Sequence, residues 1–335
     1  MIRFLIALLA LLFLPSALCA FQNYDIDDGL SQSVVFDIVQ DQQGFIWIST
    51  QAGLNRFDGN EFTVFTASDE TNSLANNYIY PLAIDNESTL FIGTRNSGVN
   101  QLALHNYQFS EPLLKERRIT SLLVAQQQVY IGTYDGSLFR YDKRAEQLET
   151  LITGLKKPIY ALSKIADTLW IGTHGAGLLH YDLINNQQIN SVFSGFAEPV
   201  DIHASIFAIK QSPDGSIWLA SQGGGLYKIA LSTQTITQWL TSNDDNSGLS
   251  SNEIRDIEFD SQGRVWLATR GGGINVYDPI DASFTVLAHD PFDKYSLAHD
   301  RVYSIYRDSS DIMWFGTAHG ISKLDPASLQ FSKLK

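Results

Sequence analysis

One stretch decides the fold of this sequence: Val265-Trp266-Leu267-Ala268-Thr269-Arg270-Gly271-Gly272-Gly273-Ile274-Asn275-Val276-Tyr277-Asp278. A large aromatic residue stands between aliphatic residues, which is typical of a buried β-strand. The glycines and the second apolar run predict a tight turn and a returning strand. The same phrase starts at six other places: Ile46-Trp47, Leu90-Phe91, Val129-Tyr130, Leu169-Trp170, Ile217-Trp218 and Met313-Trp314.

The copies follow one another at a regular interval. Their reference aromatic residues are 44, 39, 40, 48, 48 and 48 residues apart: Trp47, Phe91, Tyr130, Trp170, Trp218, Trp266 and Trp314. Such a period is typical of propeller blades, and units of this size must share one core. We therefore predict an all-β fold, a seven-bladed β-propeller of four-stranded antiparallel blades, over residues 21–335. The repeats are expected at about 29–71, 72–115, 116–154, 155–195, 196–245, 246–293 and 294–335.

Each repeat carries four short strand signals separated by turn residues. The first repeat has them at Val34–Val39, Phe45–Ser49, Leu54–Phe57 and Phe62–Phe65, and the sixth at Ile254–Phe259, Val265–Ala268, Ile274–Tyr277 and Phe284–Leu287. We expect the first strand to lie innermost. It has apolar residues three positions apart, as at Val35 and Ile38.

The N-terminus predicts export. Residues 1–20 combine Arg3, an uncharged run from Phe4 to Leu14, and small residues up to Ala20, which is typical of a cleaved secretory signal peptide. An uncleaved anchor is the alternative. Cys19 is the only cysteine, so a chain cut after Ala20 forms no disulfide. No later stretch is long and apolar enough to cross a membrane, and we expect a soluble periplasmic protein.

The excess of acidic over basic residues indicates which classes of partner the protein is able to bind. The chain has 36 acidic and 23 basic residues and a formal net charge of −13. An acidic surface repels phosphate backbones, so we expect no nucleic-acid partner.

The two ends of the chain compete for one place in the ring. Residues 21–24 resemble an outer strand such as Phe62–Phe65, and so do residues 329–334. Both cannot complete the seventh blade. Either one end is an extra strand, or the chain is part of a longer design.

The repeat pattern resembles a known family. G-L-S-x-x-x-V, then D-x-x-G-x-[IV]-W-[IL]-x-T, then G-[IL]-x-x-[FY]-D runs from Gly29 through Trp47 to Asp58, and from Gly248 through Trp266 to Asp278. It is similar to the two-component-regulator propeller repeat. The resemblance implies an exported sensor of hybrid histidine kinases or diguanylate cyclases. It also implies output domains, and no kinase, cyclase or DNA-binding segment is found in these 335 residues.

Residue types that carry chemistry show no catalytic, metal or cofactor motif. The reference tryptophans are interpreted as packing residues. The aspartates in Asp41…Gly44…Trp47 and Asp260…Gly263…Trp266 are interpreted as hairpin residues that accept backbone hydrogen bonds. The histidines lack zinc-ligand spacing, and the triple glycines precede no helix. Acidic clusters at 25–29 and 243–246 are predicted to be exposed turns, with a cation site as the alternative.

One set of positions remains as a candidate site. In an antiparallel meander, the turn between the second and third strands lies at the same end as the start of the first strand. Polar and aromatic residues at these positions converge on one face, which suits a sugar or another small polar ligand. The candidate ligand-binding residues are Gln51, Arg95, Tyr134, His174, Gln222, Arg270, Asn77, Asn252 and Arg255.

The leading hypothesis is an exported, non-catalytic sensor propeller without a cofactor. The resemblance implies a glycan fragment as ligand, with a separate signalling partner or a C-terminal output region. Two alternatives stay open: a periplasmic scaffold that docks another protein, and a polysaccharide lyase or hydrolase, since propellers host such enzymes.

Overall fold

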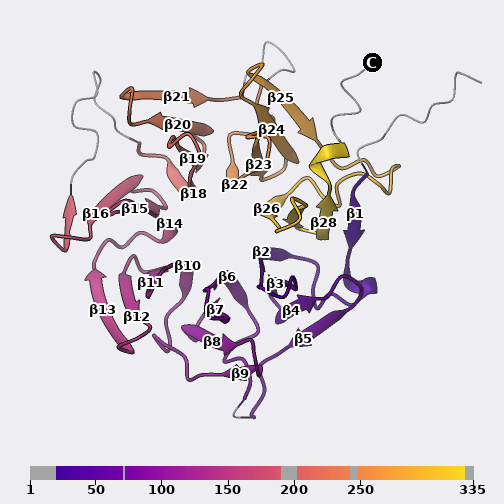
Figure 1. Cartoon of the computed structure of the whole chain (residues 1–335). Helices are drawn as coiled ribbons and strands as arrows, with labels where there is room; N and C mark the ends of the chain where they lie inside the picture. Colours follow the sequence, from indigo (N-terminus) through magenta and orange to yellow (C-terminus); the bar gives the residue numbers. More distant parts are fainter. Residues whose placement is uncertain (1–19, 71, 190–201, 242–247, 329–335) are drawn as a thin grey trace, which may run out of the picture.

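Seven four-stranded antiparallel sheets stand in a ring around a central channel (Figure 1). The computed structural model describes residues 20–70, 72–189, 202–241 and 248–328. The all-β, seven-bladed prediction is confirmed. Residues 1–19 of the predicted signal peptide, the cluster at 243–246 and the C-terminal stretch 329–334 lie outside the described residues.

We name the strands of each blade a to d from the channel outward. The first blade consists of β2 (Val35–Gln40), β3 (Ile46–Thr50), β4 (Leu54–Phe57) and β5 (Phe62–Phe65), and the second of β6 (Ile79–Ile84), β7 (Thr89–Thr94), β8 (Val99–Ala103) and β9 (Gln108–Phe109). The third blade consists of β10 (Ile119–Ala125), β11 (Gln128–Thr133), β12 (Leu138–Asp142) and β13 (Gln147–Ile152), and the fourth of β14 (Ile159–Ile165), β15 (Thr168–Thr173), β16 (Leu178–Asp182) and β17 (Gln187–Ile189).

The remaining blades follow the same order. The fifth blade consists of β18 (Ser205–Gln211), β19 (Ile217–Gln222), β20 (Leu226–Ala230) and β21 (Thr235–Trp239), and the sixth of β22 (Ile254–Phe259), β23 (Val265–Thr269), β24 (Ile274–Asp278) and β25 (Ser283–Leu287). The seventh blade consists of β26 (Val302–Arg307), β27 (Met313–Thr317) and β28 (Gly320–Leu324), and β1 (Gln22–Tyr24) is its outer strand.

The seventh blade is therefore closed by the N-terminal strand. β1 pairs antiparallel with β28, with Asn23 opposite Ser322. The Asn23 side chain also accepts a hydrogen bond from the Ser322 hydroxyl at 2.6 Å and donates to the Ser296 carbonyl at 2.9 Å. Phe21 is buried against Phe315, with ring centroids 5.9 Å apart. Closure of this kind covers the edge of β28 and gives the seventh blade four strands, like the others.

Every strand a contains a β-bulge near its start. The ladder to strand b shifts by one residue between Val35 and Asp37 in the first blade, and an equivalent shift occurs in the other six. A bulge leaves two residues on one strand opposite one on its partner, so the alternation of faces is interrupted. This explains why the buried residues of strand a, Val35 and Ile38, are three positions apart and not two.

The core lies between the blades and not in one central cluster. In one such layer Trp218 of the fifth blade packs with Ile254 and Leu267 of the sixth. The reference tryptophans are buried, with exposed fractions of 3% or less, so their interpretation as packing residues is confirmed. Trp239 on β21 also packs, since its ring stacks on that of Trp218 with centroids 5.6 Å apart.

The turns between strands a and b are organised by aspartates. Asp308 accepts hydrogen bonds from the amides of Ser310 at 2.8 Å and Ile312 at 3.0 Å, and from the indole N–H of Trp314 at 2.8 Å. Asp41 and Asp260 serve their own turns in the same way, so the hairpin interpretation is confirmed.

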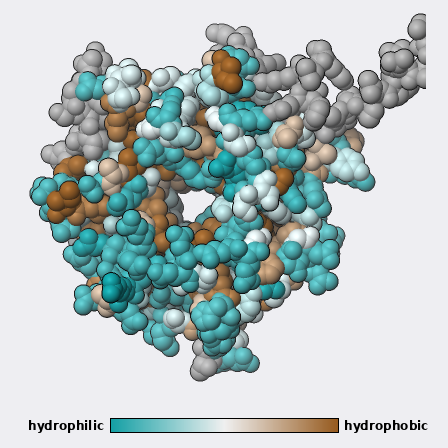
Figure 2. Space-filling model, in the orientation of Figure 1, coloured by the Kyte–Doolittle hydropathy of each residue, from teal (hydrophilic) through white to brown (hydrophobic). Residues whose placement is uncertain are grey.

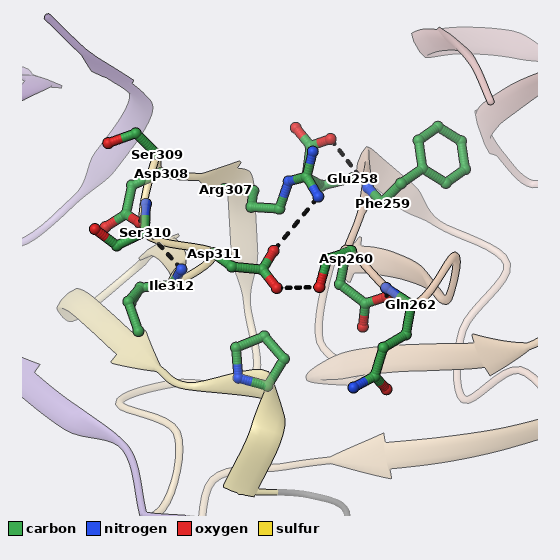
Figure 3. Close-up of polar contacts among 12 residues, drawn as sticks. Glu258, Phe259, Asp260, Gln262, Arg307, Asp308, Ser309, Ser310, Asp311 and Ile312 are labelled. Atoms are coloured by element: carbon green, nitrogen blue, oxygen red, sulfur yellow. Dashed lines mark hydrogen bonds and ion pairs between the residues drawn. The ribbon is translucent and has the colours of Figure 1, made fainter. Parts of the chain in front are cut away.

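Neighbouring hairpins also touch one another. Figure 3 shows Asp311 of the seventh blade between Arg307 and the sixth-blade hairpin. The carboxylate of Asp311 lies 3.4 Å from the Arg307 guanidinium and accepts a hydrogen bond from the Ser261 hydroxyl. We call this end of the ring the hairpin face. The opposite end, where strands a begin, is the mouth face.

The loops that lead into strands a on the mouth face are fixed by buried leucines. Leu30, Leu74, Leu249 and Leu297 are at most 4% exposed. The residue after the leucine donates its amide to a buried side chain on strand c, as Ser250 does to Asn275 at 2.9 Å. The G-L-S motif is thus a loop anchor, and it holds the start of strand a in place.

Candidate functional site at the channel mouth

The bulges direct one residue of each strand a toward the channel at its mouth. Each of these residues directly follows the first buried residue of its strand a, which is Val35 in the first blade. The seven line the channel: Phe36, Tyr80, Thr120, Tyr160, Phe207, Arg255 and Tyr303. The channel encloses about 580 Å³. Figure 2 shows an opening at the centre of the ring, with hydrophobic residues at its wall. A volume of this size is typical of small-molecule sites, roughly 300–1,000 Å³.

Aromatic side chains form two groups at the mouth. Phe36 is the centre of the first group. Its ring centroid lies 4.9 Å from that of Tyr80, 5.6 Å from that of Tyr303 and 5.8 Å from that of Tyr78. In the second group Tyr160 stacks on Phe207 with centroids 5.0 Å apart and an interplanar angle of 20°. Stacked aromatic rings present an apolar surface with polar tips.

Arginines lie over these rings. Arg118 lies 4.2 Å from the Tyr134 centroid and 5.2 Å from that of Tyr80, and Arg255 lies 4.1 Å from that of Phe207. Distances below about 6 Å are those of cation–π contacts. The arginines are thereby held in fixed orientations beside the rings.

The aromatic layer changes the acidity of its own hydroxyls. Burial raises the pKa of Tyr78 to about 12, and the adjacent Tyr80 hydroxyl adds to this shift. Burial also raises the pKa of Tyr160, against the fields of Arg118 and Arg255, which favour the phenolate. Both phenols therefore stay protonated at neutral pH and are able to donate hydrogen bonds.

A charged layer lies deeper in the channel. Asp37 accepts hydrogen bonds from the amides of Ile38 and Leu82, both at 2.8 Å, and so joins the first blade to the second. Asp256 joins the sixth blade to the seventh in the same way, through the amides of Ile257 and Ile305.

These carboxyls are harder to ionise than usual. Burial raises the pKa of Asp37 to about 7 and that of Asp256 to about 6, and the two repel one another. Lys210, which is ion-paired with Glu258 at 2.5 Å, opposes both shifts. Among the described residues, no group of three or more His, Cys, Asp and Glu side chains is arranged to hold a metal ion.

The candidate residues named from sequence separate into two groups. Arg255 and Arg270 line the channel. Arg95 lies 4.8 Å from the Tyr78 centroid, Tyr134 lies under Arg118, and the His174 ring lies 5.8 Å from that of Tyr160. These five are brought together around the mouth.

The other four lie on the mouth face away from the channel lining. Asn77 accepts the amide of Ala67 at 2.6 Å, and Asn252 accepts the amide of Thr241 at 2.7 Å, so both side chains fix loops. Gln222 pairs with Ser205 at the end of the β18–β19 ladder, and Gln51 is exposed in its turn.

Several residues of the mouth are absent from the nine candidates named on sequence, among them Tyr78 and Arg118. Tyr78 and Arg118 directly precede Ile79 and Ile119, the first residues of β6 and β10, and follow Asn77 and Arg117. Arg117 forms an ion pair with Asp135 instead. Alignment of the residue directly before the first buried residue of strand a in all seven repeats is the signal that identifies them.

Comparison with protein families supports the resemblance. Residues 29–52, 248–271 and 296–319 match the model described as two component regulator propeller. The matches fall in the first, sixth and seventh repeats and run from the anchored loop through strands a and b. Three of the seven repeats therefore match the two component regulator propeller repeat.

One relative shares a short segment. The protein named histidine kinase P4, from Formosa agariphila, is 46% identical over 50 residues, which make up 15% of this chain and 4% of that protein. A match of this length covers about one repeat. It is a second link between this repeat and signalling proteins.

Solved structures share the whole ring. The extracellular domain described as that of a hybrid two component system, BT3049 from B. thetaiotaomicron, superposes with a TM-score of 0.76 at 23% identity. The superposition covers 91% of this chain and 41% of that one. Virginiamycin B lyase from Staphylococcus aureus has a TM-score of 0.67 at 13% identity, over 91% of this chain and 98% of that one. At these identities the likeness shows the fold, and this chain spans less than half of the sensor domain. Within the described residues, no helix has the length and apolar character needed to cross a bilayer.

Proposed function

We propose that this propeller is the exported sensor module of a bacterial signal-transduction system, and that it binds a small polar ligand without catalysing a reaction. The observation that carries the proposal is the aromatic and cationic mouth of the channel. Tyr160 and Phe207 offer a stacked surface beside Arg118 and Arg255, above a space of about 580 Å³.

Glycan fragments fit this chemistry. The C–H faces of a sugar ring pack on aromatic rings, and its hydroxyls take hydrogen bonds from phenols and guanidinium groups. Tyr160 and Arg255 line the same channel, from the fourth and the sixth blade. A ligand held there contacts strands a of several blades at once, and its binding is therefore able to stiffen the ring.

The signalling role is supported by the repeats and the neighbours. Three stretches match the two component regulator propeller, and the sensor domain that shares the fold is extracellular. Since this chain spans 41% of that domain, the proposal includes a separate signalling partner or a C-terminal output region.

Export is part of the proposal. Residues 1–20 act as the cleaved signal, and the mature protein begins at Phe21 in the periplasm. N-terminal sequencing of the protein recovered from a periplasmic fraction checks this. A mature product that retains residues 1–20 in the membrane fraction would support the anchor alternative.

The binding experiment uses the purified protein and a broad panel of glycans and small metabolites. We expect at least one compound to raise the melting temperature, and Tyr160→Ala to weaken its binding at least about tenfold. His105→Ala is the matched control, since His105 is exposed in the turn between β8 and β9 on the hairpin face. A folded protein that binds no compound but captures a defined periplasmic partner would favour the docking scaffold.

One observation favours catalysis as a second candidate. Virginiamycin B lyase shares the ring over 98% of its own length, and His174 and Arg270 lie at the mouth here. Release of new products from plant or algal polysaccharides, lost in His174→Ala or Arg270→Ala, would establish a lyase or hydrolase. Unchanged polysaccharide with a bound fragment would support the sensor.

A further inference from the structure

Positive charge gathers at the channel mouth of a strongly acidic chain. The net charge is −13, yet Arg95, Arg118, Arg255 and Arg270 surround the mouth. Of these four arginines, only Arg270 has a carboxylate partner among the described residues, Glu253 at 3.4 Å. Unpaired cations that repel one another cost stability, and a site that keeps them is a candidate for binding an anion.

Two of these arginines bracket the stacked aromatic pair. Around the ring, Arg118 precedes β10 in the third blade, Tyr160 and Phe207 follow in the fourth and fifth, and Arg255 is in the sixth. Arg255 lies over Phe207 at 4.1 Å, and the fields of both arginines act on Tyr160. The stacked pair thus has the Arg255 guanidinium over the Phe207 ring, and Arg118 in the blade that precedes Tyr160.

Both guanidinium groups retain donors that the protein does not use. Arg118 donates to the Tyr80 hydroxyl at 3.2 Å, while its Nε finds no acceptor among the described residues. The Nε of Arg255 is buried and likewise has no acceptor among the described residues. Burial and the charge of Arg270 lower the pKa of Arg255. An acceptor with negative charge would satisfy these donors and relieve the repulsion.

We propose that the ligand of this site is an acidic sugar, one that bears a carboxylate or a sulfate group. The anionic group takes paired hydrogen bonds from Arg118 or Arg255, and the apolar face of the sugar ring packs on Tyr160. A planar guanidinium matches the two oxygens of such a group in a way that lysine does not. This inference rests on the proposed ligand-binding function and specifies the class of ligand.

The test uses matched pairs of oligosaccharides. Galacturonic acid trisaccharide is compared with galactotriose of the same linkage, which has a neutral CH2OH group at C6 in place of the carboxylate. Sulfated galactan oligosaccharides are compared with their desulfated counterparts. Binding is measured by calorimetry on the purified protein at two salt concentrations. We expect an acidic member to bind at least about tenfold more tightly than its neutral counterpart, and less tightly at high salt. The carboxylate and sulfate arms identify which group is recognised.

Substitutions locate the anion. Arg118→Gln and Arg255→Gln should each weaken binding of the acidic sugar at least about tenfold and bring it near the neutral counterpart. Arg118→Lys and Arg255→Lys keep the charge, preserve more of the fold, and should lose the paired geometry. Arg144→Gln is the control for net charge, because Arg144 is exposed in the turn between β12 and β13 on the hairpin face.

The outcomes separate the two proposals. A neutral sugar that binds as tightly as its acidic counterpart, and is released by Tyr160→Ala, overturns the acidic ligand and leaves the sensor function standing. Equal binding of the acidic sugar by wild type and by folded Arg118→Gln and Arg255→Gln also overturns it. Absence of binding in every arm counts against both proposals.

Discussion

Asp256 shows how one position in strand a serves two blades. Its carboxylate accepts one amide from its own strand and one from β26 of the next blade, at 2.8 and 2.9 Å. The equivalent position is Asp37 in the first blade and a serine in the third and seventh, at Ser121 and Ser304. The carboxyl strengthens the contact between blades, but it is costly to ionise inside the channel.

The free energy of unfolding should depend on pH because the Asp256 carboxyl is costly to ionise in the folded protein. Burial raises the pKa of Asp256 to about 6, so the folded protein binds this proton more tightly than the unfolded chain. Its contribution to stability is complete below about pH 4 and is lost as the pH rises through about 6. Between pH 4 and 7.5, wild type should therefore lose stability relative to Asp256→Ser, by on the order of 1–2 kcal/mol because channel water moderates the effect. Urea denaturation at several pH values gives the difference.

An aspartate with the opposite shift provides the control. Hydrogen bonds from the Glu61 and Asn60 amides lower the pKa of Asp58. Its contribution is present at neutral pH and is lost as the pH falls, so Asp58→Ser should converge with wild type in acid. A free-energy difference for Asp256→Ser that stays level from pH 4 to 7.5 would contradict the assigned shift.

At the scale of the element, the turn between strands b and c carries the tightest backbone constraint. Gly273 has φ +68°, and a Cβ there would lie 2.3 Å from the carbonyl oxygen of Leu287 at the end of strand d. Gly263, in the turn between strands a and b, has φ +79° but nothing within 4 Å of a Cβ. The two glycines share a left-handed backbone and differ in crowding.

This pair gives a matched prediction. Gly263→Ala should cost about 1 kcal/mol in free energy of unfolding, the price of a left-handed backbone alone. Gly273→Ala should cost roughly 2–4 kcal/mol, since strand d must also move. Chemical denaturation followed by tryptophan fluorescence measures both. Equal losses at the two sites would show that the close approach to Leu287 is not a constraint.

The elements themselves could be predicted because their signals are local. The turn glycines, the aspartates of the hairpins and the period of the tryptophans all act within one repeat, as the match of predicted and observed β4 illustrates. The mouth could be predicted only in part. A polar residue in a loop serves either a ligand or the backbone, and Asn77 and Asn252 serve the backbone. Arg118 depends on the path of a loop that no single repeat specifies.

At the scale of the whole molecule, closure of the ring requires contacts between residues about 300 positions apart in the sequence, such as Asn23 and Ser322. Sequence alone offers two segments for one place, residues 21–24 and 329–334. The structure pairs β1 with β28 and buries Phe21, while Tyr24 packs on Phe57 with centroids 4.9 Å apart. These contacts tie the first blade to the last.

Removal of the closing strand should therefore destabilise the entire ring. A protein that begins at Asp25 loses the β1–β28 pairing and the burial of Phe21, which we expect to cost about 3–5 kcal/mol and several degrees in melting temperature relative to one that begins at Ala20. It should also aggregate, because the edge of β28 is left free to pair with another chain. Phe21→Ala, with the strand retained, should show the smaller loss due to packing alone. Removal of residues 329–335 tests the competing segment: a loss of stability there, with none on removal of residues 20–24, would contradict closure by the N-terminal strand.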